Sequence, residues 1–221
     1  MHFTSEYEER TTLRDGTPIV VRLLRPDDRE LLKSGFEKLS PESRYTRFFA
    51  AKTTLSDDEL DYLCKIDQHS HFAIGALRET DGVGLGIARF IRLADTPDMA
   101  EAAITVADEA QGRGLGRLLF LRLCAAACER DIARFKCEVL GTNAGMKHLL
   151  EAIAPDRHIE VTQGVMSIEL VVPKVDPRET LAGPSPPGAM YRLLRAAAEN
   201  TVDWTDAIRK LWGRGRTSGE Q

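Results

Sequence analysis

The sequence predicts an α/β fold, and three observations point to it. Short β-branched runs alternate with amphipathic helical patterns over most of the chain. Two apolar runs, 71–78 and 84–93, are typical of an antiparallel pair joined by the Asp81-Gly82 turn. A further apolar run, 101–107, enters a glycine-rich turn that opens a long helical pattern. Strands and helices therefore belong to one domain.

Composition excludes several classes of protein. The chain has 221 residues, of which 43% are hydrophobic, and a formal net charge of -4. That balance gives no general attraction to nucleic acid or to an anionic membrane. No apolar run approaches the length of a membrane span. Residues 1–10 contain several Glu and no apolar core, so they do not resemble a secretory signal. We therefore expect a cytoplasmic protein.

Cysteines and histidines give no metal-binding pattern. None of the four cysteines forms a C-x-x-C pair, and we expect small buried thiols. His69 and His71 alternate as they would on one face of a strand, but no third ligand is near them in the sequence. No metal site is expected.

The remaining elements follow in order along the chain. The first strand is expected over 17–25, and Pro26 with the acidic residues after it opens a helix. Ser40-Pro41 signals a second helix, and the capping box of Ser56 and Glu59 signals a third. The later elements are expected as a strand over 101–107, a helix over 114–130, a strand over 134–140, a helix over 144–153 and a hairpin of 159–162 with 165–172.

The glycine-rich turn is expected to hold a phosphate group. Glycines let the backbone approach a ligand closely, and the first turn of a helix offers unpaired N–H groups. The spacing fits neither a P-loop nor the dinucleotide fingerprint, because Gly112, Gly114 and Gly116 alternate and Gly116 is followed by Arg117. Arg113 and Arg117 are expected to add charge-assisted contacts to the anion. The pattern that is left is Q-x-x-G-x-G over 111–116.

This hexamer resembles the acetyl-CoA-binding turn of the GNAT superfamily of N-acetyltransferases. Four further stretches resemble the catalytic domain of bacterial Pat-type protein lysine acetyltransferases: LRDG at 13–16, RLLRPDD at 22–28, LSPESRYTRFF at 39–49 and LSDDEL at 55–60. The resemblance covers about Thr12 to Pro173. It implies the GNAT fold, a mixed and mostly antiparallel sheet splayed at the cofactor site and flanked by helices. We expect no acyl-CoA synthetase-like or cyclic-nucleotide domain in this chain.

The resemblance also assigns site residues. It implies that acetyl-CoA is the co-substrate and that Glu101 is the general base. The strand edge of Ile104, Thr105 and Val106 would pair with the pantetheine arm, and Asn143 would contact the cofactor after the next strand. The pyrophosphate would lie on the turn and the helix start, formed by Gln111, Gly112, Arg113, Gly114, Leu115, Gly116 and Arg117.

The chemistry of acetyl transfer is consistent with those roles. A thioester is already activated, so the enzyme needs no covalent nucleophile. A lysine ammonium has a pKa near 10.4 in water and must lose a proton before it attacks. A carboxylate such as Glu101 can take that proton directly or through water. Backbone N–H groups near Val106 can polarise the thioester carbonyl. Asp108 and Glu109 are expected to serve a helix N-terminus instead.

One position departs from the family pattern. Many GNAT enzymes carry a Tyr after the Asn turn that protonates the leaving thiolate, whereas 146–150 reads MKHLL. The thiolate of coenzyme A is a tolerable leaving group, so this acid can be dispensable. His148 is expected to be an exposed helix residue rather than its replacement.

Three segments are expected: a GNAT domain over 1–173, a Pro- and Gly-rich linker over 174–188 and an amphipathic helical tail over 189–221. The apolar stripes of the tail, within 190–198 and 202–212, need a partner surface. That surface could belong to the same domain, to a second subunit in a homodimer, or to a membrane.

The leading functional prediction is an acetyl-CoA-dependent N-acetyltransferase acting on protein lysines. A small-molecule amine as acceptor is the first alternative. A non-catalytic acyl-CoA-binding sensor or assembly module is the second, and the missing Tyr and the helical tail favour it. Acceptor recognition is expected from the helices between Pro26 and Ile66 and from the loop 94–99, and the sequence does not identify the acceptor.

Overall fold

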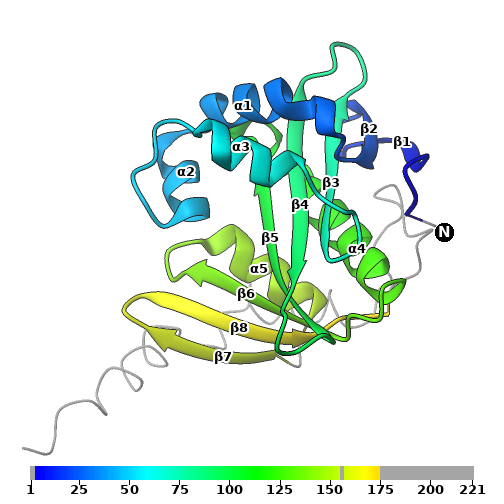
Figure 1. Ribbon diagram of the computed structural model, residues 1–221. Helices are drawn as coiled ribbons and strands as arrows, with labels where there is room; N and C mark the ends of the chain where they lie inside the picture. Colours follow the sequence, from blue (N-terminus) through cyan, green and yellow to red (C-terminus); the bar gives the residue numbers. More distant parts are fainter. Residues whose placement is uncertain (1–2, 155–156, 175–221) are drawn as a thin grey trace, which may run out of the picture. The chain divides into compact units, whose positions relative to one another are not determined.

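The computed structural model describes residues 3–154 and 157–174. Within them, eight strands form one sheet in the order β1-β2-β3-β4-β5-β6-β8-β7 (Figure 1). All neighbours are antiparallel except β5 and β6, which are parallel. The strands are β1 (Glu8–Thr12), β2 (Pro18–Leu23), β3 (His71–Arg78), β4 (Gly84–Arg92), β5 (Met99–Val106), β6 (Arg134–Leu140), β7 (Arg157–Thr162) and β8 (Val165–Val171).

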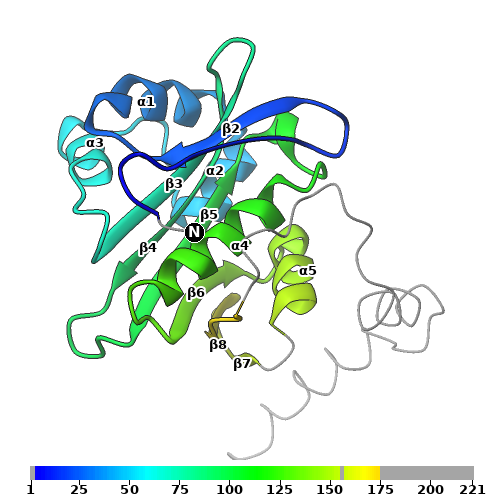
Figure 2. The same ribbon diagram turned by 90° about the vertical axis from the view of Figure 1, so that its right-hand side faces the viewer.

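Helices cover both faces of the sheet, with α1, α2 and α3 on one face and α4 and α5 on the other (Figure 2). Two short 3-10 turns precede helices. The helical elements are η1 (Pro26–Asp28), α1 (Arg29–Lys38), α2 (Pro41–Phe48), α3 (Asp57–Cys64), η2 (Asp108–Ala110), α4 (Leu115–Cys128) and α5 (Ala144–Ile153). This arrangement confirms the predicted mixed, mostly antiparallel α/β fold.

The hydrophobic core lies between the sheet and α4. Phe72 and Phe90 stack on neighbouring strands with ring centroids 5.2 Å apart, and both are fully buried. Phe135 of β6 continues the row and meets Phe120 of α4 at 6.3 Å. Such aromatic pairs add roughly 0.5–1.5 kcal/mol beyond the area they bury. The row therefore fixes α4, and with it the turn that precedes α4, against β3, β4 and β6.

The burial of α4 extends beyond the face that packs on the sheet. Its residues from Leu118 to Ala127 are all buried, because the N-terminal segment packs on the side away from the sheet. The Arg122 side chain is 1% exposed and donates two hydrogen bonds to Glu9 of β1, at 2.7 and 2.8 Å. Tyr7 donates a third to the same carboxylate, at 2.6 Å. These contacts hold β1, a strand that the sequence analysis missed.

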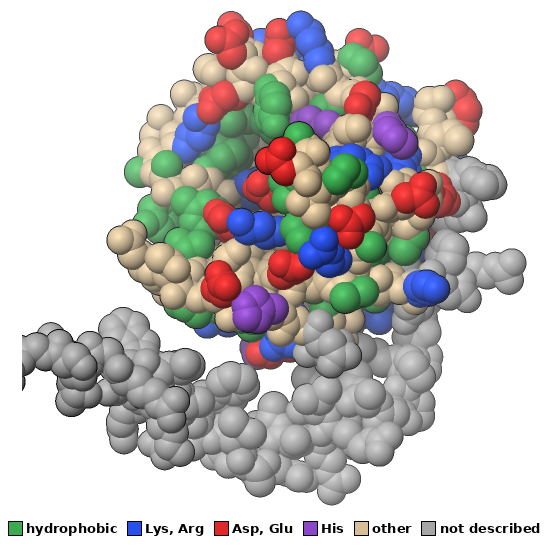
Figure 3. Space-filling model, turned by 60° about the horizontal axis from the view of Figure 1, so that its bottom comes forward, with side chains coloured by type: hydrophobic (Ala, Val, Ile, Leu, Met, Phe, Trp, Pro, Cys, Tyr) green, Lys and Arg blue, Asp and Glu red, His purple; other side chains and the backbone are tan. Residues whose placement is uncertain are grey.

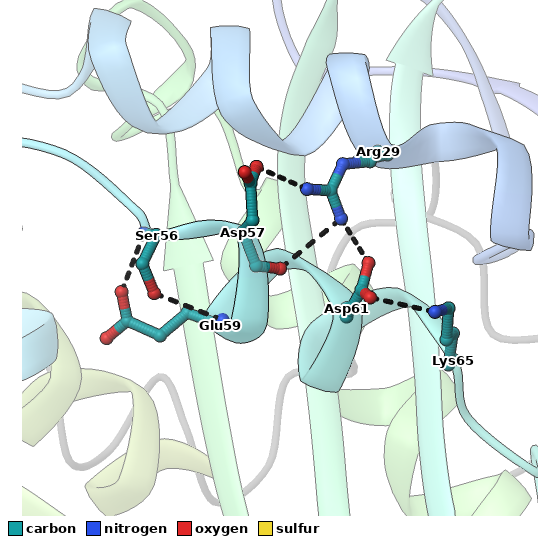
Figure 4. A network of polar contacts seen from close by, with 6 residues as sticks. All are labelled: Arg29, Ser56, Asp57, Glu59, Asp61 and Lys65. Carbon is teal, nitrogen blue, oxygen red and sulfur yellow. Dashed lines mark hydrogen bonds and ion pairs between the residues drawn. The ribbon is translucent and has the colours of Figure 1, made fainter.

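The three helices on the opposite face start where the sequence predicts. Ser56 caps α3 in the predicted capping box, accepting from the Glu59 N–H while the Glu59 carboxylate accepts from the Ser56 N–H. Arg29 of α1 reaches across and pairs with both Asp57 and Asp61 (Figure 4). The helices α1 and α3 are thus joined by charge-assisted contacts as well as by apolar packing.

The elements predicted after the glycine-rich turn are confirmed, with β6 and α5 at the predicted residues and the β7–β8 hairpin turning at Gln163-Gly164. One thiol differs from expectation: Cys128 is exposed, whereas the other cysteines are buried. The predicted helical tail and all but the first residue of the predicted linker lie outside the described residues.

Candidate active site

The parallel strands β5 and β6 separate partway along their length. Their register covers only Met99–Arg134, Ala100–Phe135 and Glu101–Lys136, although β5 continues to Val106. Beyond that point β6 pairs only with β8 (Figure 1). A strand edge without a partner exposes a row of backbone donors and acceptors. The residues 102–106 of β5 provide such an edge.

Along β5, the backbone N–H and C=O groups of alternate residues point to opposite sides of the strand, and this alternation determines which of them face the opening. Ala107 N–H donates to Leu85, and Leu93 N–H donates to Met99, so the odd-numbered residues of β5 exchange hydrogen bonds with β4. The even-numbered residues point their backbone groups the other way. The backbone groups of Ile104 and Val106 therefore face the opening. Those of Thr105 do not, because its backbone pairs with Ile87 of β4.

The glycine-rich turn lies directly after this edge. Gly112 and Gly114 have φ of 72° and 89°, left-handed conformations that strongly favour glycine. The backbone N–H groups of 112–116 donate no hydrogen bond to any described residue. Gly114 is the N-cap of α4, so these amides sit at the positive end of its dipole. A cluster of open amides at a helix start fits a phosphate group.

The side chains of the turn make contacts with neighbouring elements that the sequence analysis did not predict. Gln111 donates to the backbone oxygen of Val106 at 3.2 Å and so closes the turn onto β5. Arg113 pairs with Asp15 at 2.8 Å, which ties its guanidinium to the neighbouring loop. Arg117, the other arginine expected to contact the anion, lies half-buried in the first turn of α4.

Asp108 joins this turn to α2 on the other face of the sheet. Its carboxylate accepts from the Ser40 N–H at 2.8 Å, from the Ser40 hydroxyl at 3.0 Å and from the Ser43 hydroxyl at 2.6 Å. Asp108 thus serves a helix N-terminus as predicted, but that of α2. Desolvation raises the pKa of Asp108, and the bonds from Ser43 and Ser40 outweigh it, so the net pKa is lowered.

We expect Asp108→Asn to lower the free energy of unfolding by about 1 kcal/mol near pH 7, since an exposed charged acceptor is lost. Because the folded pKa is depressed, the stabilisation is present above the unfolded pKa of about 3.9 and is lost as the pH falls. Denaturation at pH 7 and at pH 3 checks this. Asp95→Asn is the control, because exposed Asp95 accepts no hydrogen bond from the described residues. Equal stability of the two variants at pH 7 would contradict the assignment.

Asn143 caps α5, where its side-chain oxygen accepts from the Met146 N–H at 3.0 Å. That oxygen is therefore engaged in the cap, whereas the amide NH₂ donates to no described residue. His148 is 81% exposed on α5, as predicted.

Glu101 lies at the last paired position before β5 and β6 separate. Its side chain is exposed, and no described residue donates a hydrogen bond to it. The charge of Glu101 acts on two neighbours. Burial lowers the pKa of Arg47 from α2, and the Glu101 charge opposes that shift. Burial raises the pKa of Cys137 to about 12, and the Glu101 charge adds to the rise. A carboxylate without a protein donor can accept a proton from a ligand.

A pocket of about 110 Å³ lies between the sheet and α1–α3. Leu31, Phe36 and Phe48 are among its apolar walls, and Arg47 and Arg89 are among its polar lining. The sequence analysis did not identify these two arginines. Arg89 could have been noticed, because it stands between Ala88 and Phe90 inside an otherwise apolar strand.

Arg89 donates to the Nε2 of His71 at 3.1 Å. Burial and the Arg89 charge lower the pKa of His71 to about 4, so the ring is neutral at pH 7 and accepts this bond. Because the unfolded ring protonates near pH 6.5 and the folded ring does not, stability falls as the pH drops from about 6.5 to 4. Between pH 6.5 and pH 4, the free energy of unfolding of His71→Gln should therefore fall less than that of the wild type, by on the order of 1–3 kcal/mol.

Denaturant midpoints measured between pH 7 and pH 4 check this expectation. His148→Gln, at an exposed position, serves as the control and should behave like the wild type. A His71→Gln protein that loses as much stability as the wild type over this range would contradict it.

Acidic and basic side chains are interspersed on the face of the molecule that Figure 3 shows. Among the described residues, no cluster of three or more His, Cys, Asp or Glu could hold a metal. No described helix has the length and apolar character needed to span a membrane.

The separated strands, the open amides at the start of α4 and the carboxylate at the point of separation are features that an acyl-CoA-dependent transferase would need. Residues 30–154 match the Acetyltransferase (GNAT) family, which is more than half of the chain. The chain therefore belongs to the GNAT acetyltransferase family, whose acetyl donor is acetyl-CoA.

Particular relatives agree. The Acetyltransferase Pat of Mycolicibacterium smegmatis is 31% identical over 164 residues, which cover 74% of this chain and 49% of that protein. The Acetyltransferase PA5475 of Pseudomonas aeruginosa is 31% identical over 144 residues, 64% of this chain and 77% of that protein. The GNAT domain of S. lividans PAT superposes with a TM-score of 0.69 at 32% identity, covering 77% of this chain and 99% of that domain. The chain thus spans about half the length of the M. smegmatis relative.

Proposed function

We propose that this protein transfers an acetyl group from acetyl-CoA to a primary amine, the side chain of a protein lysine, with Glu101 as the general base. The observation that carries the proposal is that Glu101 stands where β5 and β6 separate. Edge groups for the pantetheine arm and amides for the diphosphate follow it in sequence. The relatedness to Pat proteins supports a lysine as the acceptor.

The edge groups of Ile104 and Val106 would bind the amide-bearing arm of acetyl-CoA, and the N–H groups of 112–116 its diphosphate. Asn143 would add a contact through its amide. The acetyl thioester supplies an activated carbonyl, so no covalent enzyme intermediate is needed. Because Glu101 lies on the same strand as the arm's binding edge, the carboxylate and the thioester can approach one point.

Catalysis then requires the loss of two protons from the nitrogen and one substitution at the carbonyl carbon. Glu101 takes a proton from the lysine ammonium, and the neutral nitrogen attacks the thioester carbonyl carbon. The carbon–sulfur bond breaks and the thiolate of coenzyme A leaves. An N–H group of β5 near Val106 would stabilise the negative charge that develops on the carbonyl oxygen. The second proton of the nitrogen is released to solvent as the amide forms.

Mass spectrometry of lysate proteins after incubation with the purified protein and isotopically labelled acetyl-CoA tests the proposal. We expect labelled lysines that depend on the protein. Label that appears only in low-molecular-weight amines would instead identify a small-molecule acetyltransferase. Tight coenzyme A binding without transfer to any acceptor would identify a sensor.

A further inference from the structure

Arg47 and Arg89 line the pocket beside Glu101, on the face of the sheet covered by α1–α3. Arg89 is 5% exposed, and within the described residues its only hydrogen-bond partner is neutral His71. Arg47 stacks over Phe48 at 5.1 Å, and no described carboxylate bonds it. Two guanidinium groups therefore face the pocket with no carboxylate hydrogen-bonded to either.

Two other buried arginines of this protein are paired with carboxylates. Arg22, which lines the same pocket, donates two hydrogen bonds to Asp28, at 2.7 and 2.6 Å. Arg122 is held by Glu9 in the same two-pronged way. A buried charge without a partner is costly, so proteins keep such groups mostly where a ligand completes the pair. Burial and the Arg47 charge lower the pKa of Arg89 to about 10, so Arg89 is still cationic at pH 7.

The pocket lies close to the reaction centre. Arg89 is opposite Ala103, and Ile91 is opposite Glu101, so Arg89 and Glu101 are diagonal neighbours on one face of the sheet. Such neighbours are roughly 7–8 Å apart. Arg47 is within electrostatic reach of both Glu101 and Arg89. A substrate group a few bonds from the reacting atoms would reach the arginines.

The lining decides the chemistry of that group. Most of the wall is aliphatic or aromatic, and the volume of about 110 Å³ is well above the ~10–15 Å³ that one water needs. An aliphatic chain of a few carbons fits the walls, and a carboxylate fits the planar, two-pronged donors of arginine.

We propose that Arg47 and Arg89 form a subsite for a carboxylate on a short aliphatic chain, carried by a substrate of the acyl transfer. The inference rests on the proposed function. The carboxylate can come from the acceptor, as an acidic residue beside the target lysine, or from the donor, as the far end of a dicarboxylic acyl group.

Direct binding tests the subsite without any turnover. The probe is glutarate, compared with neutral glutaramide, in an NMR titration of the whole chain. We expect saturable binding of glutarate but not of glutaramide. Arg47→Gln should weaken glutarate binding about tenfold, the range for a lost charge-assisted hydrogen bond. Arg44→Gln is the matched control from the same helix, because Arg44 does not line the pocket and donates to the Thr53 carbonyl. It should bind as the wild type does.

Kinetics then separate the two sources of the carboxylate. One arm compares acetyl transfer to Glu-Lys and Gln-Lys peptides, and the other compares succinyl-CoA with butyryl-CoA as donor. We expect a preference of about tenfold in kcat/KM for the carboxylate form in one arm, lost in Arg47→Gln. Equal binding of glutarate and glutaramide, an unaltered Arg47→Gln protein, or no preference in either arm would overturn the subsite. Absent turnover would overturn the proposed function alone, because glutarate binding still decides the subsite.

Discussion

Replacing Glu101 with Gln is expected to lower kcat for acetyl transfer at least tenfold, and up to about 10²–10⁴-fold, with little change in coenzyme A affinity. The amide is nearly isosteric but accepts no proton at neutral pH. Glu101 is exposed, and the described residues donate no hydrogen bond to it, so its replacement leaves no buried group without a partner.

The dependence on pH gives a second signature. Without a base, the reaction relies on the fraction of lysine that is already neutral, which rises towards its pKa of about 10.4. The Glu101→Gln protein should therefore recover activity as the pH is raised from 7 to 9, more steeply than the wild type. Initial rates at saturating acetyl-CoA over this range measure it.

Glu138→Gln is the matched control for this experiment. Glu138 is an exposed glutamate of the neighbouring strand β6, two residues beyond the Lys136 that pairs with Glu101. It should retain wild-type rates at every pH. Full activity of Glu101→Gln would remove Glu101 from the mechanism.

The second large effect is expected at the glycine-rich turn. Gly114→Ala should weaken coenzyme A binding tenfold or more, with a loss of stability of about 1–2 kcal/mol. Gly114 has a φ of 89° at the N-cap of α4, where an alanine is strained. Relief of that strain would rotate the amides of 112–116 that we expect to bind the diphosphate. Calorimetry with coenzyme A measures the affinity, and thermal unfolding measures the strain.

Gly82→Ala provides a control with similar strain elsewhere. Gly82 has a φ of 69° in the turn between β3 and β4. Apart from Gly82 itself and its two chain neighbours, no heavy atom would lie within 4 Å of an added Cβ. It should show a similar loss of stability and unchanged coenzyme A affinity. If both variants bind coenzyme A as the wild type does, the turn is not the diphosphate site.

The order of elements from β2 to β8 could be predicted from the sequence because each carries its own local signal. Ser56 and Glu59 mark the start of α3, and Gly82 and Gly164 mark two hairpins. The strand β1 carries none, since EERTT is polar and is held by a contact between Glu9 and Arg122, 113 residues apart. Contacts of that range are invisible in a periodic pattern.

The same distinction applies to the candidate site, because its local features can be predicted from the sequence and its long-range contacts cannot. The turn at 111–116 and the edge of β5 are local features, which a pattern in the sequence can indicate. Side-chain partners depend on elements from elsewhere in the chain. The pair of Arg113 with Asp15, the bond of Gln111 to Val106 and the contact of Asp108 with α2 could only be seen in three dimensions. The same holds for the pocket lined by Arg47 and Arg89.

The most direct test of the account is a ¹H–¹⁵N NMR titration of the whole chain with coenzyme A. We predict that the largest amide shifts fall on Gly112, Gly114 and Gly116, with further shifts at Ile104 and Val106. Saturable binding that leaves these amides unmoved, or no binding at millimolar coenzyme A, would contradict the proposed acetyl-CoA site.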